Sequence, residues 1–205
     1  MKRALFYFES LTFTSFQNFF CAGRVLRGFM SLVVLTKNNF LRLALHSIYD
    51  ELDLKENTCV IDTESFSALI DILYEIYTRD LVSFRRVLLL GGDDIGSKIL
   101  SPLNVISLDS PLAVLKNQMH TGYSLKTVLE RIHECRRLIA LTDGERLFAQ
   151  YYSSRNSIKN IARRIGLSEK TVYHHTASAA AKLNLRSGKE FLLFLDREFS
   201  NNPGR

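Results

Sequence analysis

Short apolar runs alternate with longer amphipathic stretches over the first 120 residues of this 205-residue chain. The runs are rich in Val, Leu and Ile and are bounded by polar residues or glycine, which is typical of buried β-strands. They cover residues 3–8, 31–35, 58–62, 86–90 and 104–108. Because strands that alternate with helices need crossover connections, the pattern predicts a parallel, doubly wound α/β domain over residues 1–120.

The stretches between these runs carry apolar residues at helical spacing. The clearest is 64–78, where the apolar positions recur with a period of 3.6 and can form one stripe against a sheet. Further helices are expected around 11–26, 39–49, 94–100 and 110–118. After residue 118 the strand pattern ends, and we expect a hinge at Met119–Tyr123 and a connecting helix at Leu125–Leu138. The chain is therefore predicted to have a linker at 121–137 and an all-helical domain at 138–200.

The sequence NSIKNIARRIGLSEKTVYHHT, residues 156–176, has the periodicity of two short helices joined by a tight turn. Four apolar residues of the first helix share one face: Ile158, Ile161, Ala162 and Ile165. Gly166 is expected to form the turn, Leu167 to pack between the two helices, and Ser168 to cap the second helix. Two helices joined by a glycine-containing turn of this length predict a helix-turn-helix.

Residues 168–183, placed on a helix at about 100° per residue, separate into three faces. The inward face carries Val172, Thr176, Ala179 and Leu183. The opposite face carries Lys170, Tyr173, His174, Ala177 and Ala181. A flank carries Thr171, His175, Ser178 and Lys182. An outward face with a cation, hydrogen-bonding rings and then small residues fits a major groove, and the flank suits phosphate oxygens.

These faces give a set of candidate DNA-binding residues. We expect Lys170, Tyr173 and His174 to face bases. The residues expected to bind the DNA backbone are Lys159, Arg163, Ser168, Thr171, His175 and Lys182. The adjacent His174 and His175 point about 100° apart on a helix, so they cannot ligate one metal ion together. We expect neither a metal site nor a cofactor, and the chain lacks the nucleophile–base arrangement of an enzyme.

The charge is distributed unevenly along the chain. Residues 1–120 carry 12 Lys and Arg against 13 Asp and Glu, a balance of −1, whereas residues 136–189 carry 11 against 3, a balance of +8. A basic second part favours a polyanionic partner, although an anionic membrane surface would fit the charge equally well. The three widely spaced cysteines favour a reducing cytoplasm, and no apolar stretch approaches the roughly 18 residues of a membrane span. We therefore expect a cytoplasmic protein without a membrane contact.

Residues 138–199 resemble the LuxR/FixJ-type helix-turn-helix domain of bacterial transcription regulators. That family typically has the pattern L-T-x-R-E, then I-A, then I-S-x-x-T-V-K-x-H, then K-L. The matching positions are Leu141, Thr142, Glu145, Ile161, Ala162, Leu167, Ser168, Thr171, Val172, His175, Lys182 and Leu183. The departures are Gly144, Leu147, Arg155 and Tyr173. The resemblance implies a regulator that binds double-stranded DNA as a homodimer, or as a heterodimer with another LuxR-type regulator.

The usual partner of this module is a receiver domain, and the layout of residues 1–120 is receiver-like. A working receiver has an acidic pair after its first strand, an Asp after the third, Thr or Ser after the fourth and Lys after the fifth. Here Asp62 ends the third run, Glu9 follows the first run alone, Gly91–Gly92 follows the fourth and Asp109 the fifth. The resemblance therefore implies a degenerate, phosphorylation-independent receiver-like domain, of the type found in auxiliary enterobacterial regulators.

The leading interpretation is a bacterial transcription regulator in which helix 168–183 enters the major groove. Two alternatives stay open. In the first, Asp62 is a phosphoacceptor and the chain is a phosphorylatable response regulator. In the second, which the departures Gly144, Arg155 and Tyr173 favour, the chain is a co-regulator that binds a partner regulator and does not contact DNA itself.

Overall fold

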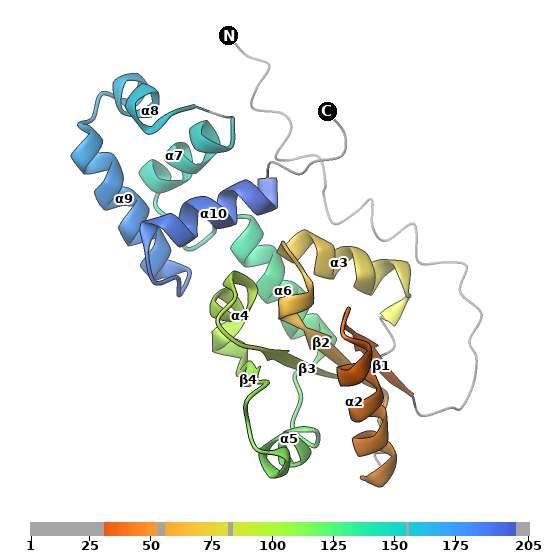
Figure 1. The fold of residues 1–205 in the computed structure, drawn as a ribbon. Coiled ribbons are helices and arrows are strands. Elements are labelled where there is room, and N and C mark those ends of the chain that lie inside the picture. Colours follow the sequence, from red (N-terminus) through yellow and green to blue (C-terminus); the bar gives the residue numbers. More distant parts are fainter. Residues whose placement is uncertain (1–30, 53–55, 82–83, 155, 200–205) are drawn as a thin grey trace.

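The computed structural model describes residues 31–52, 56–81, 84–154 and 156–199 (Figure 1). The strand expected at 3–8 and the helix expected at 11–26 lie outside these residues. The elements of the first domain follow in chain order: β1 (Leu32–Leu35), α2 (Asn39–Glu51), β2 (Thr58–Asp62), α3 (Leu69–Thr78), β3 (Arg86–Gly91), α4 (Ile95–Leu100), β4 (Ile106–Ser107), α5 (Leu112–Gln118) and α6 (Leu125–Arg136).

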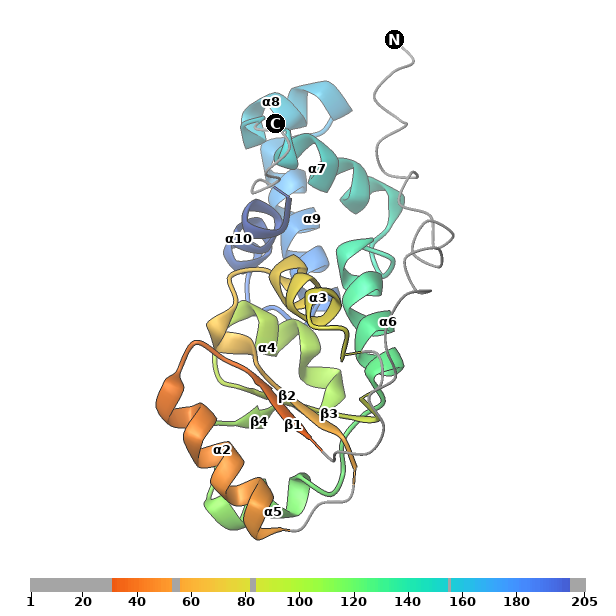
Figure 2. The same ribbon diagram turned by 90° about the vertical axis from the view of Figure 1, so that its right-hand side faces the viewer.

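The four strands form one parallel sheet in the order β1-β2-β3-β4. Helices α2 and α5 lie on one face of this sheet, and α3, α4 and α6 lie on the other (Figure 2). The side chains of β2 alternate accordingly. Cys59 and Ile61 belong to the apolar core shared with α3, α4 and α6, whereas Val60 belongs to the core shared with α2. The predicted α/β domain with helices on both faces is confirmed.

Two elements of this domain are shorter than the sequence predicted. The helix expected from residue 64 begins at Leu69, because Thr63–Ser65 form a 3₁₀ turn that the Thr63 hydroxyl ties to the Leu90 carbonyl at 3.0 Å. The strand expected at 104–108 is reduced to β4, because Asn104 adopts a left-handed φ of 48° at the end of a preceding 3₁₀ turn. In both places a side-chain or backbone feature specific to the fold overrides the apolar pattern.

The predicted connecting helix forms α6, which ends at Arg136, and Leu138 two residues later has a φ of 54°. Val128 and Ile132 of α6 are fully buried in the core that also contains residues of α3 and α4. The segment predicted to be a linker is therefore packed as part of the helical layer on one face of the sheet (Figure 2).

The last four helices form the second domain: α7 (Asp143–Ser153), α8 (Ile158–Ile165), α9 (Glu169–Lys182) and α10 (Gly188–Phe199). Its core is built around Phe148 and Phe191, whose ring centroids are 6.5 Å apart. The all-helical second domain is confirmed. In Figure 1, α10 lies between the other three helices of this domain and the α3 side of the sheet. No helix in the described part of the chain is long and apolar enough to cross a membrane.

Candidate nucleic-acid interface

The turn between α8 and α9 has the geometry that its sequence predicts. Gly166 ends α8 in the left-handed region at φ 70°, and the Leu167 N–H donates to the Ala162 carbonyl at 2.9 Å. A Cβ at position 166 would meet no atom within 4 Å, so glycine is favoured here by backbone conformation and not by space. The expected role of Leu167 is wrong: its side chain is 40% exposed and does not fill the space between the helices.

Helix α9 begins at the serine that the sequence assigned as its cap. The Ser168 hydroxyl accepts a hydrogen bond from the Thr171 N–H at 3.1 Å, and Glu169 follows in the first turn. The hydroxyls of Ser168 and Thr171 are also 2.8 Å apart. This local network fixes the direction in which α9 leaves the turn.

The inward face of α9 is the face that the helical spacing predicted. Val172, Thr176, Ala179 and Leu183 are all buried, and the Thr176 hydroxyl is satisfied by the Tyr173 carbonyl at 2.7 Å. Ala180 is buried beside them. Because the buried residues occupy one side, the rotation of α9 about its own axis is set by its packing.

The opposite face of α9 is open to solvent. Lys170, Tyr173, His174, Ala177 and Ala181 are all exposed, and Tyr173 is 55% exposed despite its size. The face thus combines one ammonium group and two hydrogen-bonding rings near the start of the helix with two methyl groups further along. The first half of this face is therefore rich in hydrogen-bond donors, and the second half carries only small side chains.

The flank of α9 is half-buried. Thr171, His175 and Ser178 lie here, and the His175 ring approaches the start of α7, where a Cβ at Gly144 would be 4.0 Å from it. His174 and His175 therefore occupy different environments. Among the described residues no group of three or more His, Cys, Asp or Glu side chains could hold a metal ion.

Lys182, the last of the expected backbone-binding residues, is already paired inside the domain. Its ammonium group lies 2.7 Å and 3.0 Å from the two carboxylate oxygens of Glu145, which is almost fully buried. Burial raises the pKa of Glu145, but hydrogen bonds from Lys182, Thr142 and Ser178 outweigh it and lower the pKa to about 2. We therefore infer that Lys182 stabilises the domain, and we propose the candidate interface without it.

Helix α8 contributes the remaining cations. Lys159 and Arg163 are both exposed and are one turn apart on α8. Arg164 takes another direction, with its guanidinium 5.8 Å from the centre of the Tyr151 ring. Lys159 and Arg163 therefore lie at exposed positions of α8, the helix that precedes α9; the two helices are drawn in Figure 1.

Asp62 is the last residue of β2, at the carboxyl-terminal end of the strands, and its side chain is buried. One carboxylate oxygen accepts hydrogen bonds from the Thr36 and Ser65 hydroxyls, both at 2.6 Å, and the other has no hydrogen-bond partner among the described residues. Asp62 is among the residues that line a hollow of about 730 Å³, together with Lys37, Glu64 and Asp94. Desolvation and, after it, the nearby Asp94, Asp62 and Asp109 raise the pKa of Glu64.

Sequence reasoning missed Thr36, which stands beside Asp62 at the end of the neighbouring strand. The signal was present, since Thr36 directly follows the 31–35 run, but the sequence alone did not indicate that this run is adjacent to β2. The Thr36 hydroxyl thus donates to the Asp62 carboxylate from the end of β1.

Residues 140–195, which include all of α7, α8 and α9 and most of α10, match the family described as bacterial regulatory proteins, luxR family. The chain carries a luxR-family domain. Its boundaries agree with the segment that resembled this family in sequence, and the four helices described above form it. No curated protein matches the chain.

Most of the chain is also similar in fold to solved structures of response regulators. A structure of the two-component response regulator RcsB in complex with DNA is 14% identical, covers 83% of this chain and 99% of its own, and gives a TM-score of 0.51. RcsB from Salmonella enterica serovar Typhimurium, bound to promoter rprA in the presence of phosphomimetic BeF₃⁻, is 12% identical, with coverages of 82% and 99% and a TM-score of 0.55. At these identities the likeness establishes the fold: an α/β domain followed by the luxR-family domain.

A third structure, two RcsB dimers bound to two parallel DNAs, is 14% identical and gives a TM-score of 0.52, with coverages of 83% and 99%. The receiver-like fold class and the luxR-family domain predicted from the sequence are therefore confirmed together.

Proposed function

We propose that the luxR-family domain binds double-stranded DNA with α9 in the major groove, and that the chain is a transcription regulator. The observation that carries this proposal is the division of α9 into a buried side and an open side. Val172 and Leu183 hold the helix on the domain, which leaves Lys170, Tyr173 and His174 exposed along its first two turns. A B-DNA major groove is wide enough for one helix presented in this way.

The base contacts would come from the first half of the exposed face. Lys170 can donate to guanine acceptors, and His174 and Tyr173 can donate to or accept from base edges. The exposed Ala177 and Ala181 further along the helix carry only methyl groups, so the second half of α9 can approach the groove closely. We expect sequence preference to depend on these three polar side chains.

The backbone contacts would come from two elements. Lys159 and Arg163 on α8 are exposed cations, and Thr171, His175 and Ser168 lie at or beside the start of α9. Helix N-termini and such side chains are common partners of DNA phosphates. Because cations released from DNA drive this kind of binding, affinity should fall steeply as salt rises. A regulator acting on DNA in this way is expected in the cytoplasm.

We further propose that the chain binds as a dimer, either with itself or with another luxR-family regulator. Two copies of α9 that enter successive major grooves need half-sites about one helical turn apart. The RcsB structures include dimers and a promoter complex of that protein, which supports the same arrangement here.

The proposal is tested by measuring binding of the full-length protein to a pool of random-sequence 30-base-pair duplexes over a salt series. The Lys170→Glu variant is compared with Lys126→Glu, which makes the same change of charge at an exposed position of α6. We expect salt-dependent binding by the wild type and Lys126→Glu, with at least a tenfold loss in Lys170→Glu. Equal binding by both variants would show that α9 does not contact the DNA, and no binding by the wild type would refute the proposal and favour the co-regulator alternative.

We also propose that this activity does not require phosphorylation of Asp62. In support, the Asp62 carboxylate is buried, it binds two hydroxyl groups, and Thr36 occupies the neighbouring strand end. A receiver's phosphoryl group needs Mg²⁺, which binds through clustered carboxylates. Incubation with acetyl phosphate, followed by intact mass measurement, should show no added phosphoryl group. A gain of one phosphoryl group in the wild type but not in Asp62→Asn would instead establish the phosphorylatable alternative.

A further inference from the structure

Glu198, at the end of α10 in the luxR-family domain, is bound inside the α/β domain. Its side chain is fully buried and accepts a hydrogen bond from the Leu69 N–H at 2.8 Å, across 129 residues of sequence. The Arg136 guanidinium of α6 pairs with the other carboxylate oxygen. One acidic side chain thus joins α10 to both α3 and α6.

The N-terminus of α3 is capped in part by its own Asp71, whose carboxylate accepts a hydrogen bond from the Ala68 N–H at 3.2 Å, and in part by Glu198. The residue before its first turn is Ala68, whose methyl side chain cannot accept a hydrogen bond from the helix. Alanine is among the poorest residues at this position, and a carboxylate is among the best. The second domain therefore supplies the acceptor for the Leu69 N–H that Ala68 cannot provide.

The partners of Glu198 offset part of the effect of its burial. Burial raises the pKa of Glu198, while Arg136 and the Leu69 and Ile70 N–H groups act in the opposite direction. An unpaired carboxylate at this buried position would cost free energy. We therefore expect the hydrogen bond from Leu69 and the ion pair with Arg136 to form and break together.

A second ion pair holds the other end of α10. The Lys98 ammonium group of α4 lies 2.7 Å from the Glu190 carboxylate, and both side chains are largely buried. Lys98 stands one turn after Asp94, which caps α4 at the same edge of the sheet as Asp62. Helix α10 is therefore bound to the α/β domain at both of its ends.

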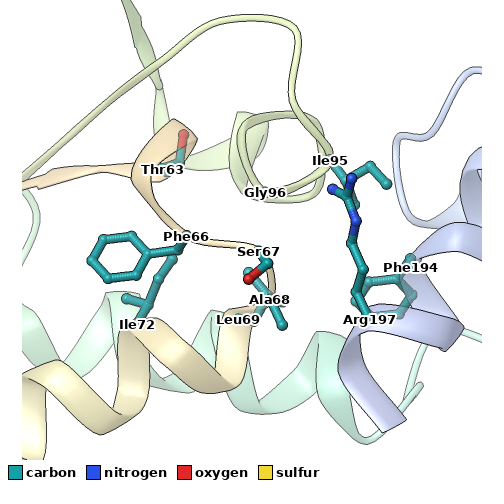
Figure 3. Close-up of a pocket in the computed structure, with 10 residues that line it drawn as sticks. All are labelled: Thr63, Phe66, Ser67, Ala68, Leu69, Ile72, Ile95, Gly96, Phe194 and Arg197. Carbon is teal, nitrogen blue, oxygen red and sulfur yellow. The ribbon is translucent and has the colours of Figure 1, made fainter. Parts of the chain in front are cut away.

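Only six residues separate Asp62 from Leu69, and they are fixed at each end. Asp62 holds the Ser65 hydroxyl at 2.6 Å, and Phe66 and Ser67 then pass along α10. Figure 3 shows Phe194 and Arg197 of α10 facing this segment across a small cavity of about 10 Å³. Because this connection is short and held at both ends, we expect a displacement of Asp62 to be transmitted to Leu69 and α10.

We propose that Glu198 couples the Asp62 edge of the sheet to the luxR-family domain, so that ordering of residues 63–69 and docking of α10 are one cooperative event. A ligand or modification in the hollow at Asp62 would then change the docking of α10, and a change in docking would reciprocally change affinity in the hollow. The use of this coupling to regulate DNA binding rests on the proposed function, whereas the coupling itself does not.

Amide hydrogen exchange of the full-length protein, measured by mass spectrometry without DNA, tests the coupling. Glu198→Ala removes the charge and the cap, and Glu198→Gln keeps an acceptor oxygen for the Leu69 N–H. Lys189→Ala, at an exposed position of α10, is the matched control. We expect about tenfold faster exchange in Glu198→Ala, by the same factor in residues 66–72 and in α10, a smaller rise in both with Glu198→Gln, and none in the control.

The reverse direction is tested with Ser65→Ala. The Ser65 hydroxyl hydrogen-bonds Asp62, Thr36 and the Lys37 N–H, all within the α/β domain. We expect faster exchange in α10 in this variant, and no change with Thr78→Ala, whose hydroxyl bonds only within the last turn of α3. Faster exchange confined to residues 63–70 in both Glu198→Ala and Ser65→Ala would overturn the coupling. Because no DNA is present, this outcome is distinct from a failure of DNA binding.

Discussion

The interactions that hold the Glu145 carboxylate, from Lys182, Thr142 and Ser178, should together contribute measurably to the stability of the luxR-family domain. The pKa of Glu145 falls from 4.5 to about 2, and each pKa unit corresponds to about 1.36 kcal/mol, which gives roughly 3 kcal/mol for the ionised form. The Lys182 side chain is 34% exposed, so solvent screens part of this interaction. We therefore expect Glu145→Gln to lower the free energy of unfolding by about 2 kcal/mol.

The assay is urea denaturation followed by far-ultraviolet circular dichroism, since the chain contains no tryptophan. Glu130→Gln is the control, because it removes a carboxylate that is 60% exposed on α6. We expect the control to change the free energy of unfolding by less than about 0.5 kcal/mol. A loss below about 0.5 kcal/mol in Glu145→Gln would refute the assignment of Lys182 to a structural role and return it to the candidate interface.

The same pair predicts a pH dependence with a definite sign. Because the pKa of Glu145 is lowered by folding, its contribution is complete above about pH 4.5 and is lost as the pH falls towards about 2. The difference in unfolding free energy between wild type and Glu145→Gln should be constant from about pH 7 to pH 5 and shrink below that. A difference that grows on acidification would contradict this reasoning.

Three further substitutions test the helix-turn-helix geometry, each by denaturation of the full chain. Gly166→Ala should destabilise by about 1 kcal/mol, because a Cβ at φ 70° is strained although it has room, and Gly166→Asn should lose less. Ser168→Ala should cost about 1 kcal/mol through loss of the α9 cap, and a neutral result would mean that the cap is not formed in solution. Leu167→Ser should change stability by less than about 0.5 kcal/mol, because the side chain is exposed; a loss above about 2 kcal/mol would indicate that it packs between the helices after all.

The helical second domain was readable from the sequence because its signals are local. Apolar spacing placed Val172 and Leu183 on the buried side of α9, and Gly166 and Ser168 marked the turn between α8 and α9. Each depends on residues within one or two turns of each other, so no knowledge of the remaining chain was needed. Leu167 was assigned wrongly because periodicity does not reveal whether a turn residue finds a partner.

The contacts between distant residues could not be read in the same way. Lys182 was expected to bind DNA because it lies on the polar flank of α9, and its partner Glu145 is 37 residues earlier. Glu198 gave no signal at all as the cap of α3, because a cap supplied from 129 residues away leaves no local pattern. Thr36 was likewise missed, since its position beside Asp62 depends on which strands are neighbours.

The most direct test of the whole account is photo-crosslinking to DNA from single positions. A benzophenone-bearing amino acid would replace Tyr173 on the open face of α9 or, as a control, Leu147, which is 41% exposed on α7. The full-length protein is mixed with the random-sequence 30-base-pair duplexes at low salt and illuminated. We predict covalent DNA adducts from position 173 and few from position 147. Adducts from position 147 alone, or from neither position, would contradict the assignment of α9 as the DNA-binding helix.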